Sequence, residues 1–374
     1  MVKTNGENAC SLFGDYDADY PREVIIKRGL EKNGMKVLEC NCCMEHSSNK
    51  SISSPLYLFK AYVKLLRKFR IIRCQFSVFL IPHNNHLIIP LAWLLSRIYG
   101  KRLIVDAFDP AHRTALMNGL SPFQVRNRYY LEKLALKLSD HILVETNEFA
   151  NLYIEAYRVK KSKFFVLPVG ADQTKFYFQS LEQKTFDRFV VLYWGNFHRH
   201  HGVEVIIKAA ELLRDHDDIR FILVGSGSNR DQYMKMAKDI NLKNVEFTGF
   251  LSNGELVDLI SHADACLGIF SSHRLALCSI TNKVLQGLAM GKAVITERSP
   301  VAEKLFQHQK HLYMISPENP NELAQALLKI KTDHILRARL EQNGYTKFIA
   351  EFSEEAIGKR LWSLIIGKTT VRCG

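Results

Sequence analysis

Short apolar segments alternate with amphipathic segments along the chain, and polar, glycine-containing loops lie between them. Residues 189–228 show the order most clearly, with an apolar run, a polar loop, a helical pattern and a second apolar run that ends at Gly225. Residues 263–296 repeat this order, and Gly291 closes their helical pattern, which begins near Lys283. A strand, a helix and a strand in this order form a parallel crossover unit. The pattern predicts an α/β fold built on parallel sheets.

The amino-terminal part of the chain follows the same plan. Residues 9–13 form an apolar run, Pro21 begins a helical pattern that ends near Gly34, and residues 35–40 form the next apolar run. Proline near the start of a helix and glycine just past its end are typical. In open parallel sheets the functional residues lie beyond the carboxyl ends of strands, so we expect them in the polar loops that follow each run. Further apolar runs with polar residues after them occupy 76–81, 102–105 and 141–144.

The length and composition suit two domains. The chain has 374 residues, and 47% of them are hydrophobic, which is enough for two sizeable cores. A polar stretch at 177–188 separates the two halves. We therefore expect one Rossmann-like domain over residues 1–178 and a second over residues 188–350.

Residues suited to binding an anion gather where two helices of the second half begin. Thr281 and Asn282 are good capping residues for the helix that contains Lys283, and the N–H groups at such a start face anions. Arg199 and His201 precede the other helix, where cations suit a diphosphate. A well-packed structural segment and a solvated turn are the alternatives that the residues leave open.

The segment from residue 278 to 295 resembles the donor-binding segment of the retaining glycosyltransferases of the GT-B fold (family 4). The two glutamates of that family's E-x7-E motif fall on Cys278 and Gln286. Residues 244–251 similarly resemble the family's N-V-x-F-x-G element, whose loop lies against the nucleotide base. The residues that match the first motif are Asn282-Lys283-Val284, Ala289-Met290-Gly291-Lys292 and Val294-Ile295.

The resemblance implies two Rossmann-like domains facing across a cleft, with residues 351–374 forming a helix that returns to the first domain. It implies transfer of a sugar from a nucleotide sugar to a hydroxyl of a glycan or lipid-linked acceptor, with retention of anomeric configuration. Arg199, His201 and Lys283 would neutralise the leaving diphosphate. The nucleotide sugar is the substrate, and no cofactor is expected. The residues expected to bind it are Gly195, Asn196, Gly225, Gly249, Phe250, Thr281, Asn282 and Gln286.

Because both motif glutamates are absent, the sequence is also compatible with a second function. Gln286 can bond a ribose as a neutral partner, for about 1 kcal/mol where a carboxylate gives about 2 kcal/mol. Cys278 cannot replace a carboxylate. The alternative is a catalytically inactive relative that keeps the fold and binds a glycan, a lipid or a partner protein.

Loops of the first domain supply the candidate residues for the acceptor. Gly14 ends a strand where a ligand can approach the backbone. His83 and His86 lie three residues apart in a loop that offers no third metal ligand, so we expect a substrate contact and no metal. Asp106 and Asp109 follow another strand, and they either contact substrate or cap the next helix.

The charge and the cysteine content of the chain indicate its partners and its cellular location. The net charge is +13, and residues 57–73 interleave cations with apolar residues at helical spacing. Such a helix either rests on an anionic membrane or packs on the core with a solvated face. No nucleic-acid module is visible, so nucleic acid is not expected as a partner. The eight cysteines lack a C-x2-C pair and suit free thiols. Without a signal peptide or an apolar run of roughly 20 residues, we expect a cytoplasmic protein that can associate with a membrane.

Overall fold

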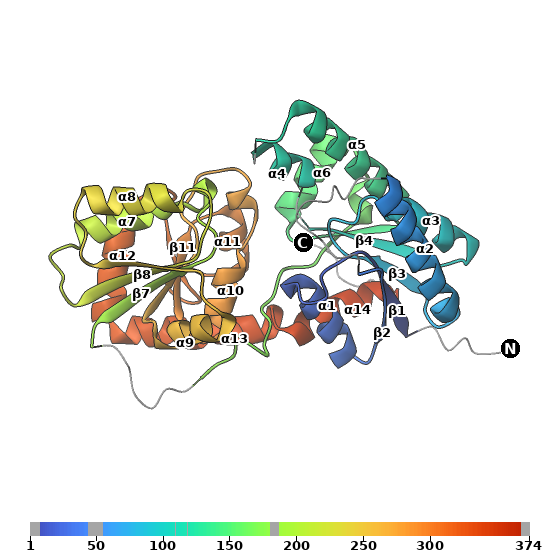
Figure 1. The fold of residues 1–374 in the computed structure, drawn as a ribbon. Helices are drawn as coiled ribbons and strands as arrows, with labels where there is room; N and C mark the ends of the chain where they lie inside the picture. Colours follow the sequence, from blue (N-terminus) through green and yellow to red (C-terminus); the bar gives the residue numbers. More distant parts are fainter. Residues whose placement is uncertain (1–7, 44–54, 109, 118, 180–186, 368–374) are drawn as a thin grey trace. The chain divides into compact units, whose positions relative to one another are not determined.

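The computed structural model describes residues 8–43, 55–108, 110–117, 119–179 and 187–367. These residues form two units, one that extends to Pro168 and includes the residues from Glu354 onward, and one from Val169 to Ser353 (Figure 1). Within the described ranges, each unit contains a parallel sheet of six strands with helices packed on it. The two-domain α/β fold that the sequence predicts is therefore confirmed.

The sheet of the first unit has the strand order β2-β1-β3-β4-β5-β6, and every neighbouring pair is parallel. All four residues of β3 are buried, as expected for an apolar strand covered on both faces. This order makes β1, β3 and β4 neighbours, so the loops after these strands share one edge of the sheet. The strands are β1 (Ala9–Gly14), β2 (Lys36–Asn41), β3 (Val78–Ile81), β4 (Arg102–Phe108), β5 (His141–Val144) and β6 (Phe164–Val166).

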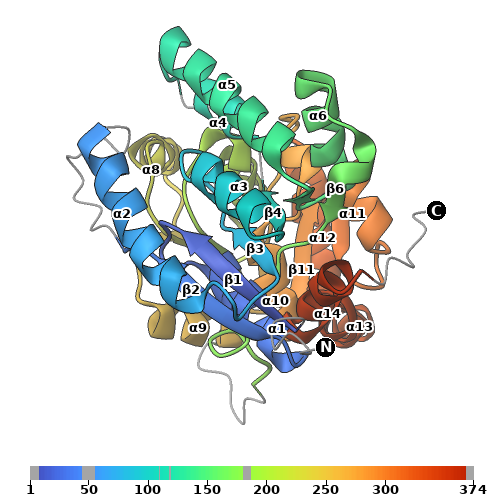
Figure 2. The ribbon, with the colours of Figure 1, turned by 90° about the vertical axis from the view of Figure 1, so that its right-hand side faces the viewer.

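Helices cover both faces of this first sheet (Figure 2). One core contains side chains of α1 (Pro21–Lys32) and α14 (Glu354–Ile365). The core on the other face contains side chains of α2 (Pro55–Ile72), α3 (Ile89–Ile98) and α5 (Pro122–Leu138). On α2 the buried residues Ala61, Leu65 and Phe69 are four positions apart, so they form a single stripe. The remaining helices are α4 (Ala111–Met117), before α5, and α6 (Asn147–Tyr157), between β5 and β6.

The sheet of the second unit has the order β12-β11-β10-β7-β8-β9, and it is also parallel throughout. Strand β10 is shorter than the apolar run 264–270, because the amide of Phe270 donates to the carbonyl of His201 in a loop and not to a neighbouring strand. The strands are β7 (Phe189–Trp194), β8 (Ile219–Val224), β9 (Val245–Gly249), β10 (Ala265–Leu267), β11 (Ala293–Glu297) and β12 (Tyr313–Ile315).

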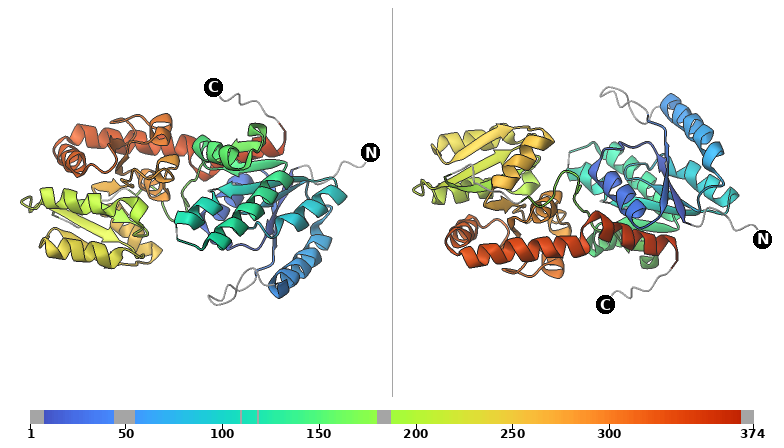
Figure 3. Two further views of the ribbon diagram at one scale, coloured as in Figure 1. Left: turned by 90° about the horizontal axis from the view of Figure 1, so that it is seen from above. Right: turned by 90° about the horizontal axis from the view of Figure 1, so that it is seen from below.

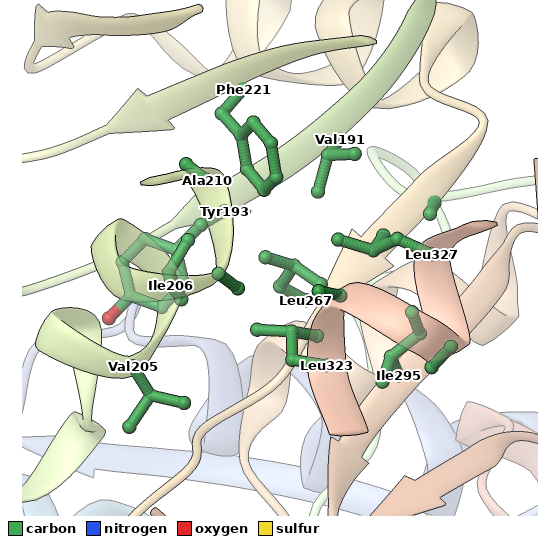
Figure 4. Close-up of a cluster of buried hydrophobic side chains, with 14 of the residues drawn as sticks. Val191, Tyr193, Val205, Ile206, Ala210, Phe221, Leu267, Ile295, Leu323 and Leu327 are labelled. Atoms are coloured by element: carbon green, nitrogen blue, oxygen red, sulfur yellow. The ribbon is translucent and has the colours of Figure 1, made fainter. Parts of the chain in front are cut away.

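The core of the second unit lies between one face of this sheet and the helices α7 (Val203–Leu212) and α12 (Pro320–Thr332). Figure 4 shows Ile206 of α7 and Leu323 of α12 directed toward Leu267 and Ile295 of the strands. Helix α10 (Asn282–Ala289) packs on the opposite face, which carries Cys266 and Val294. The other helices are α8 (Arg230–Asp239), α9 (Asn253–His262), α11 (Pro300–Leu305) and α13 (His334–Glu351).

The division between the units lies earlier in the chain than the polar stretch 177–188 suggests. The ring of Phe178 packs against Tyr345 at a centroid distance of 5.5 Å, and it lies beside Gly291. These apolar contacts therefore hold this part of the chain on the second unit. The polar composition of residues 177–188 does not predict them. Within the described part of the chain, every helix is too short or too polar to span a lipid bilayer.

Two glycines bring helices α1 and α14 into backbone contact. The views of Figure 3 show the two helices side by side. A Cβ atom at Gly29 would lie 2.3 Å from the carbonyl oxygen of Glu354, and one at Gly358 would lie 1.9 Å from the carbonyl oxygen of Gly29. Any larger residue would force the helices apart. This contact holds the carboxyl-terminal helix on the first unit.

We expect the substitution Gly358→Ala to destabilise the first unit by about 1–3 kcal/mol, because the added methyl group overpacks this contact. Chemical denaturation monitored by tryptophan fluorescence would measure the change. Gly254→Ala is the matched control, since a Cβ there meets no atom within 4 Å. Equal stability of the two variants would show that the helices separate without cost.

Candidate functional site

Loops after β7, β8 and β9 meet at the carboxyl edge of the second sheet. A Cβ atom at Gly225 would lie 2.0 Å from the carbonyl oxygen of Gly195. The amide of Gly225 donates to the carbonyl oxygen of Gly249 at 2.7 Å. Three glycines that the sequence places in separate segments are thus in direct contact. Because no side chain fits between these backbones, a ligand can approach them closely.

Lys283 lies in the first turn of α10, and its side chain points under the same edge. The residue is only 6% exposed, and its amine lies 4.7 Å from the centre of the Tyr193 ring. Its Nζ atom would be 3.5 Å from a Cβ atom at Gly195. Within the part of the chain that the structure describes, the amine has no hydrogen-bond partner. Burial lowers the pKa of Lys283 to about 7, although the charge of Glu297 opposes the shift.

Glu297 is the acidic group whose charge acts on this amine, and the sequence did not indicate it. It ends strand β11 and is 3% exposed. Its Oε2 atom accepts a hydrogen bond from the Thr296 hydroxyl at 3.0 Å. Burial raises the pKa of Glu297 to about 8. The available signal was an acidic residue at the end of an otherwise apolar strand.

The start of α10 lacks a side-chain cap. Thr281 stands at the N-cap position, as its sequence predicts, but its side chain makes no capping hydrogen bond. The hydroxyl oxygen of Thr281 is buried and has no partner among the described residues. Asn282 is exposed. The amide of Val284 donates to the carbonyl oxygen of Thr281, and the N–H groups that precede it at this helix start can bind an anion.

The side chain of Gln286 is hydrogen-bonded to strand β7. Its Oε1 atom accepts a hydrogen bond from the indole nitrogen of Trp194 at 2.8 Å. This leaves the amide NH2 group to donate to a ligand. Cys278 is buried in a short 3-10 turn, Ala276–Cys278, so no carboxylate occupies either of the two motif positions.

A cluster of imidazoles follows β7. In the 3-10 turn Arg199–His201, the rings of His200 and His201 lie 4.7 Å apart, and the ring of His198 lies 5.5 Å from that of His201. His201 Nδ1 lies 2.6 Å from the carbonyl oxygen of Asn196. Burial and the nearby Lys283 lower the pKa of His201 to about 2.

The charge at this turn therefore differs from the charge that the sequence suggests. Burial also lowers the pKa of His200 to about 4, so both imidazoles are neutral at pH 7. Arg199 is exposed and makes no ion pair among the described residues. It is the permanent cation of the turn. At the other side of the edge, Phe250 follows β9 with 83% of its surface exposed, a free apolar face beside the glycine loops.

The candidate residues of the first unit gather at the carboxyl edge of its own sheet. A Cβ atom at Gly14 would lie 2.6 Å from Asn85 Oδ1, so close packing with Asn85 explains this glycine. Asp106 is buried and forms an ion pair with Arg22, with 2.9 Å between Oδ1 and Nη2. Its carboxylate therefore has a structural partner. Asp109 lies outside the described residues.

The two histidines of this edge face different carboxylates. His83 Nδ1 lies 2.7 Å from Glu23 Oε1, whereas His86 lies near Glu132. Glu132 is buried and also contacts His112, with 2.9 Å between Oε2 and Nδ1. Among the described residues, no three histidine, cysteine or acidic side chains are placed to hold a metal ion. Neither Glu23 nor Glu132 stands out in the sequence, since both lie inside helical patterns.

Solved structures share the fold over 96% of this chain. Sucrose-phosphate synthase from Thermosynechococcus elongatus is 18% identical, with a TM-score of 0.68 over 96% of this chain and 98% of that protein. Anabaena HepE in complex with UDP is 15% identical, with a TM-score of 0.68 over 96% of this chain and all of that protein. These likenesses confirm the GT-B fold that the resemblance implies.

Curated relatives match in sequence over shorter ranges. The lipopolysaccharide core biosynthesis glycosyltransferase LpsD of Rhizobium meliloti is 29% identical over 172 residues, which are 46% of this chain and 47% of LpsD. Mannosylfructose-phosphate synthase of Agrobacterium fabrum is 23% identical over 66% of this chain and 57% of that protein. The chain thus matches about half the length of these relatives. Residues 173–347 match the sequence model described as Glycosyl transferases group 1. Through these residues, the chain is similar to the group 1 glycosyltransferases.

Proposed function

We propose that the protein transfers a glycosyl group from a nucleotide sugar to a hydroxyl of a glycan or lipid-linked acceptor, with retention of anomeric configuration. The observation that carries this proposal is the buried amine of Lys283. It has no hydrogen-bond partner among the described residues, and it lies beside the glycine loops and the uncapped start of α10. A diphosphate would supply the negative oxygens that these groups lack.

The chemistry follows from charge that develops on the leaving group. When the bond between the sugar and the diphosphate breaks, the diphosphate gains negative charge, and fixed positive groups stabilise it. Arg199 and a protonated Lys283 would supply two charges, and the N–H groups of α10 would supply partial charge. His201 is neutral in the free protein, so it would act as a hydrogen-bonding group that holds the loop through Asn196.

The nucleotide end of the donor fits the other side of the edge. Phe250 offers an exposed ring, and the Gln286 amide can donate to a ribose hydroxyl. UDP is the first candidate, since the Anabaena HepE structures contain UDP and UDP-glucose. Relatives named for lipopolysaccharide core and colanic acid biosynthesis support a glycan or lipid-linked acceptor.

Thermal unfolding in the presence of UDP, GDP or ADP, and of their sugar conjugates, tests the proposal. A ligand that binds only the folded protein adds about 2.7 kcal/mol at 100 times its dissociation constant. We expect one nucleotide series to raise the unfolding temperature selectively, and release of that nucleotide from its sugar conjugate to follow. If no nucleotide shifts the transition, donor binding fails and the protein is not a glycosyltransferase.

Nucleotide affinity should depend on pH through Lys283. Its pKa of about 7 leaves the amine neutral at higher pH, and a bound diphosphate favours the charged form, so binding then takes up a proton. We expect the dissociation constant of UDP to rise by up to about tenfold per pH unit above about pH 7. Calorimetric titrations at several pH values would measure this slope. Lys283→Met should bind more weakly and lose the slope, whereas a flat wild-type profile would remove Lys283 from the diphosphate site.

We also propose that α2 rests on an anionic membrane surface. The helix carries no acidic residue, and Leu56 and Phe59 are 64% and 67% exposed. Lys60, Arg67 and Arg70 are exposed beside them, whereas Lys68 donates to a backbone carbonyl. Exposed apolar side chains on a helix that also carries cations suit the boundary between headgroups and acyl chains.

Sedimentation with lipid vesicles tests this contact. The protein should bind vesicles that contain phosphatidylglycerol and leave them at high salt, because counterions screen the cations. It should not bind vesicles of phosphatidylcholine alone. Phe59→Ser should reduce binding severalfold, and Leu212→Ser, at a comparably exposed position on the second unit, should not. Equal binding to both vesicle types, or no binding, would contradict the contact.

A further inference from the structure

A hollow of about 480 Å³ lies at the amino edge of the first sheet, opposite to the loop that holds His83. It is formed where helix α3 ends, strand β4 begins and the chain enters strand β5. Strand β4 has seven residues, so roughly 20 Å of strand separates the hollow from the loop after β4. A small ligand of this hollow therefore cannot touch the candidate residues at the carboxyl edge. The lining residues are Ser96, Arg97, Gly100, Lys101, Arg102 and Asp140.

The turn after α3 brings three cations to this hollow. Gly100 has a φ of 61°, a left-handed conformation that suits glycine. The amide of Lys101 donates to the carbonyl oxygen of Ser96 at 2.8 Å, which closes the turn as a Schellman motif. Because the turn is this tight, Arg97 in the last turn of α3 lines the same hollow as Lys101 and Arg102, which follow the helix. A Cβ atom at Gly100 would meet no atom within 4 Å, so this side of the hollow is open.

Asp140 is the carboxylate of the lining, and both of its oxygens already accept hydrogen bonds. Oδ1 accepts from Arg97 Nη2 at 2.6 Å, and Oδ2 accepts from the amide of Leu103 at 2.8 Å. Asp140 therefore neutralises Arg97 and holds its guanidinium at the rim, where 46% of the arginine side chain is exposed. A guanidinium has five N–H donors, so Arg97 can also donate to a ligand.

Lys101 and Arg102 have no carboxylate partner within 4 Å among the described residues. Lys101 Nζ donates to the carbonyl oxygen of Phe76 and lies 4.2 Å from the centre of the Phe76 ring. Arg102 Nη1 donates to the carbonyl oxygen of Leu364, near the end of α14, at 3.3 Å. Burial lowers the pKa of Lys101, because the amine has lost water that no carboxylate replaces. Both cations keep further N–H groups for a ligand.

The charge balance of the lining favours an anion. Three cations and one carboxylate leave two positive charges. The carboxyl ends of α3 and α14 offset about half a charge each, so a positive surplus remains. A phosphate monoester carries about 1.5 to 2 negative charges at pH 7 and offers three acceptor oxygens, which match the fork of a guanidinium. The volume of the hollow is within the range of small-molecule sites.

We propose that this hollow binds a small soluble phosphate monoester, whose oxygens accept hydrogen bonds from Arg97, Lys101 and Arg102. The ester would be an effector rather than a reactant, because the hollow and the candidate acceptor loops lie at opposite edges of the sheet. Through Arg102, its binding would also stabilise the end of α14. The proposal does not depend on the transferase function and uses none of the groups that would bind the nucleotide sugar.

Calorimetric titration of the full chain with glucose 6-phosphate and glycerol 3-phosphate tests the site. We expect both esters to bind with dissociation constants of about 1 mM or below, and the neutral methyl α-glucoside not to bind. Lys101→Met keeps the hydrocarbon stem over Phe76 and should weaken binding about tenfold, as expected for the loss of a hydrogen bond to a charged group. Lys36→Met is the matched control and should bind as the wild type does. Lys36 is exposed at the start of β2, on the same edge of the sheet, and two strands separate β2 from β4.

Two further variants separate this site from folding and from the donor site. Arg102→Lys keeps the charge but loses the fork, so it should weaken ester binding severalfold with little change in the unfolding temperature of the free protein. Lys283→Met should bind the esters normally, and loss of binding in this variant alone would place the phosphate at the donor site and overturn the proposal. No ester binding, or equal binding by the wild type, Lys101→Met and Arg102→Lys, would also overturn it. Binding to vesicles that contain phosphatidic acid, without binding of either soluble ester, would assign the hollow to a lipid head group and contradict a soluble ligand.

Discussion

Burial of charge where parallel strands end is the constraint on which both units depend. In the second unit, burial brings the pKa of the Lys283 amine to about 7 and that of the Glu297 carboxyl to about 8. Neither group has an ion-pair partner within 4 Å among the described residues, so each remains responsive to a charged ligand. In the first unit, Arg22 and Asp106 satisfy each other through two hydrogen bonds and form a fixed support. The carboxyl edge of the second sheet therefore keeps buried ionisable groups that an anion can affect. At the edge of the first sheet, the buried charges neutralise each other.

Close backbone packing makes these edges possible. Gly225 touches the carbonyl of Gly195 in one sheet, and Gly14 touches Asn85 in the other. In both places, two segments pack in direct contact because glycine has no side chain. The outcome differs because Lys283 lies under the first pair, whereas the Asn85 amide fills the space at the second. A glycine at the end of a strand therefore marks a ligand site only when the neighbouring element leaves room.

The residues at the two motif positions affect how the proposed donor site would bind a diphosphate. Neither Cys278 nor Gln286 supplies a carboxylate, and Gln286 is bonded to Trp194. The imidazoles of His200 and His201 are neutral because they are buried beside one another and beside Lys283. The proposed donor site would therefore rely on Arg199, on the protonation of Lys283 and on the start of α10. This dependence on a titrating amine is a consequence of three-dimensional proximity.

The sequence by itself determined the alternation of strands and helices, the two parallel sheets and the polar loops that follow the strands, because these follow from local hydrophobic periodicity and from glycine and proline positions. It also indicated Lys283 and His83 as functional candidates. The tertiary structure alone decided their partners: Glu297 stands 14 positions from Lys283 and Glu23 stands 60 positions from His83. It also decided that the chain after Pro168 packs on the second unit. Burial and pairing depend on contacts between segments far apart in the chain, and no local pattern encodes the distance or the dielectric environment that shifts a pKa.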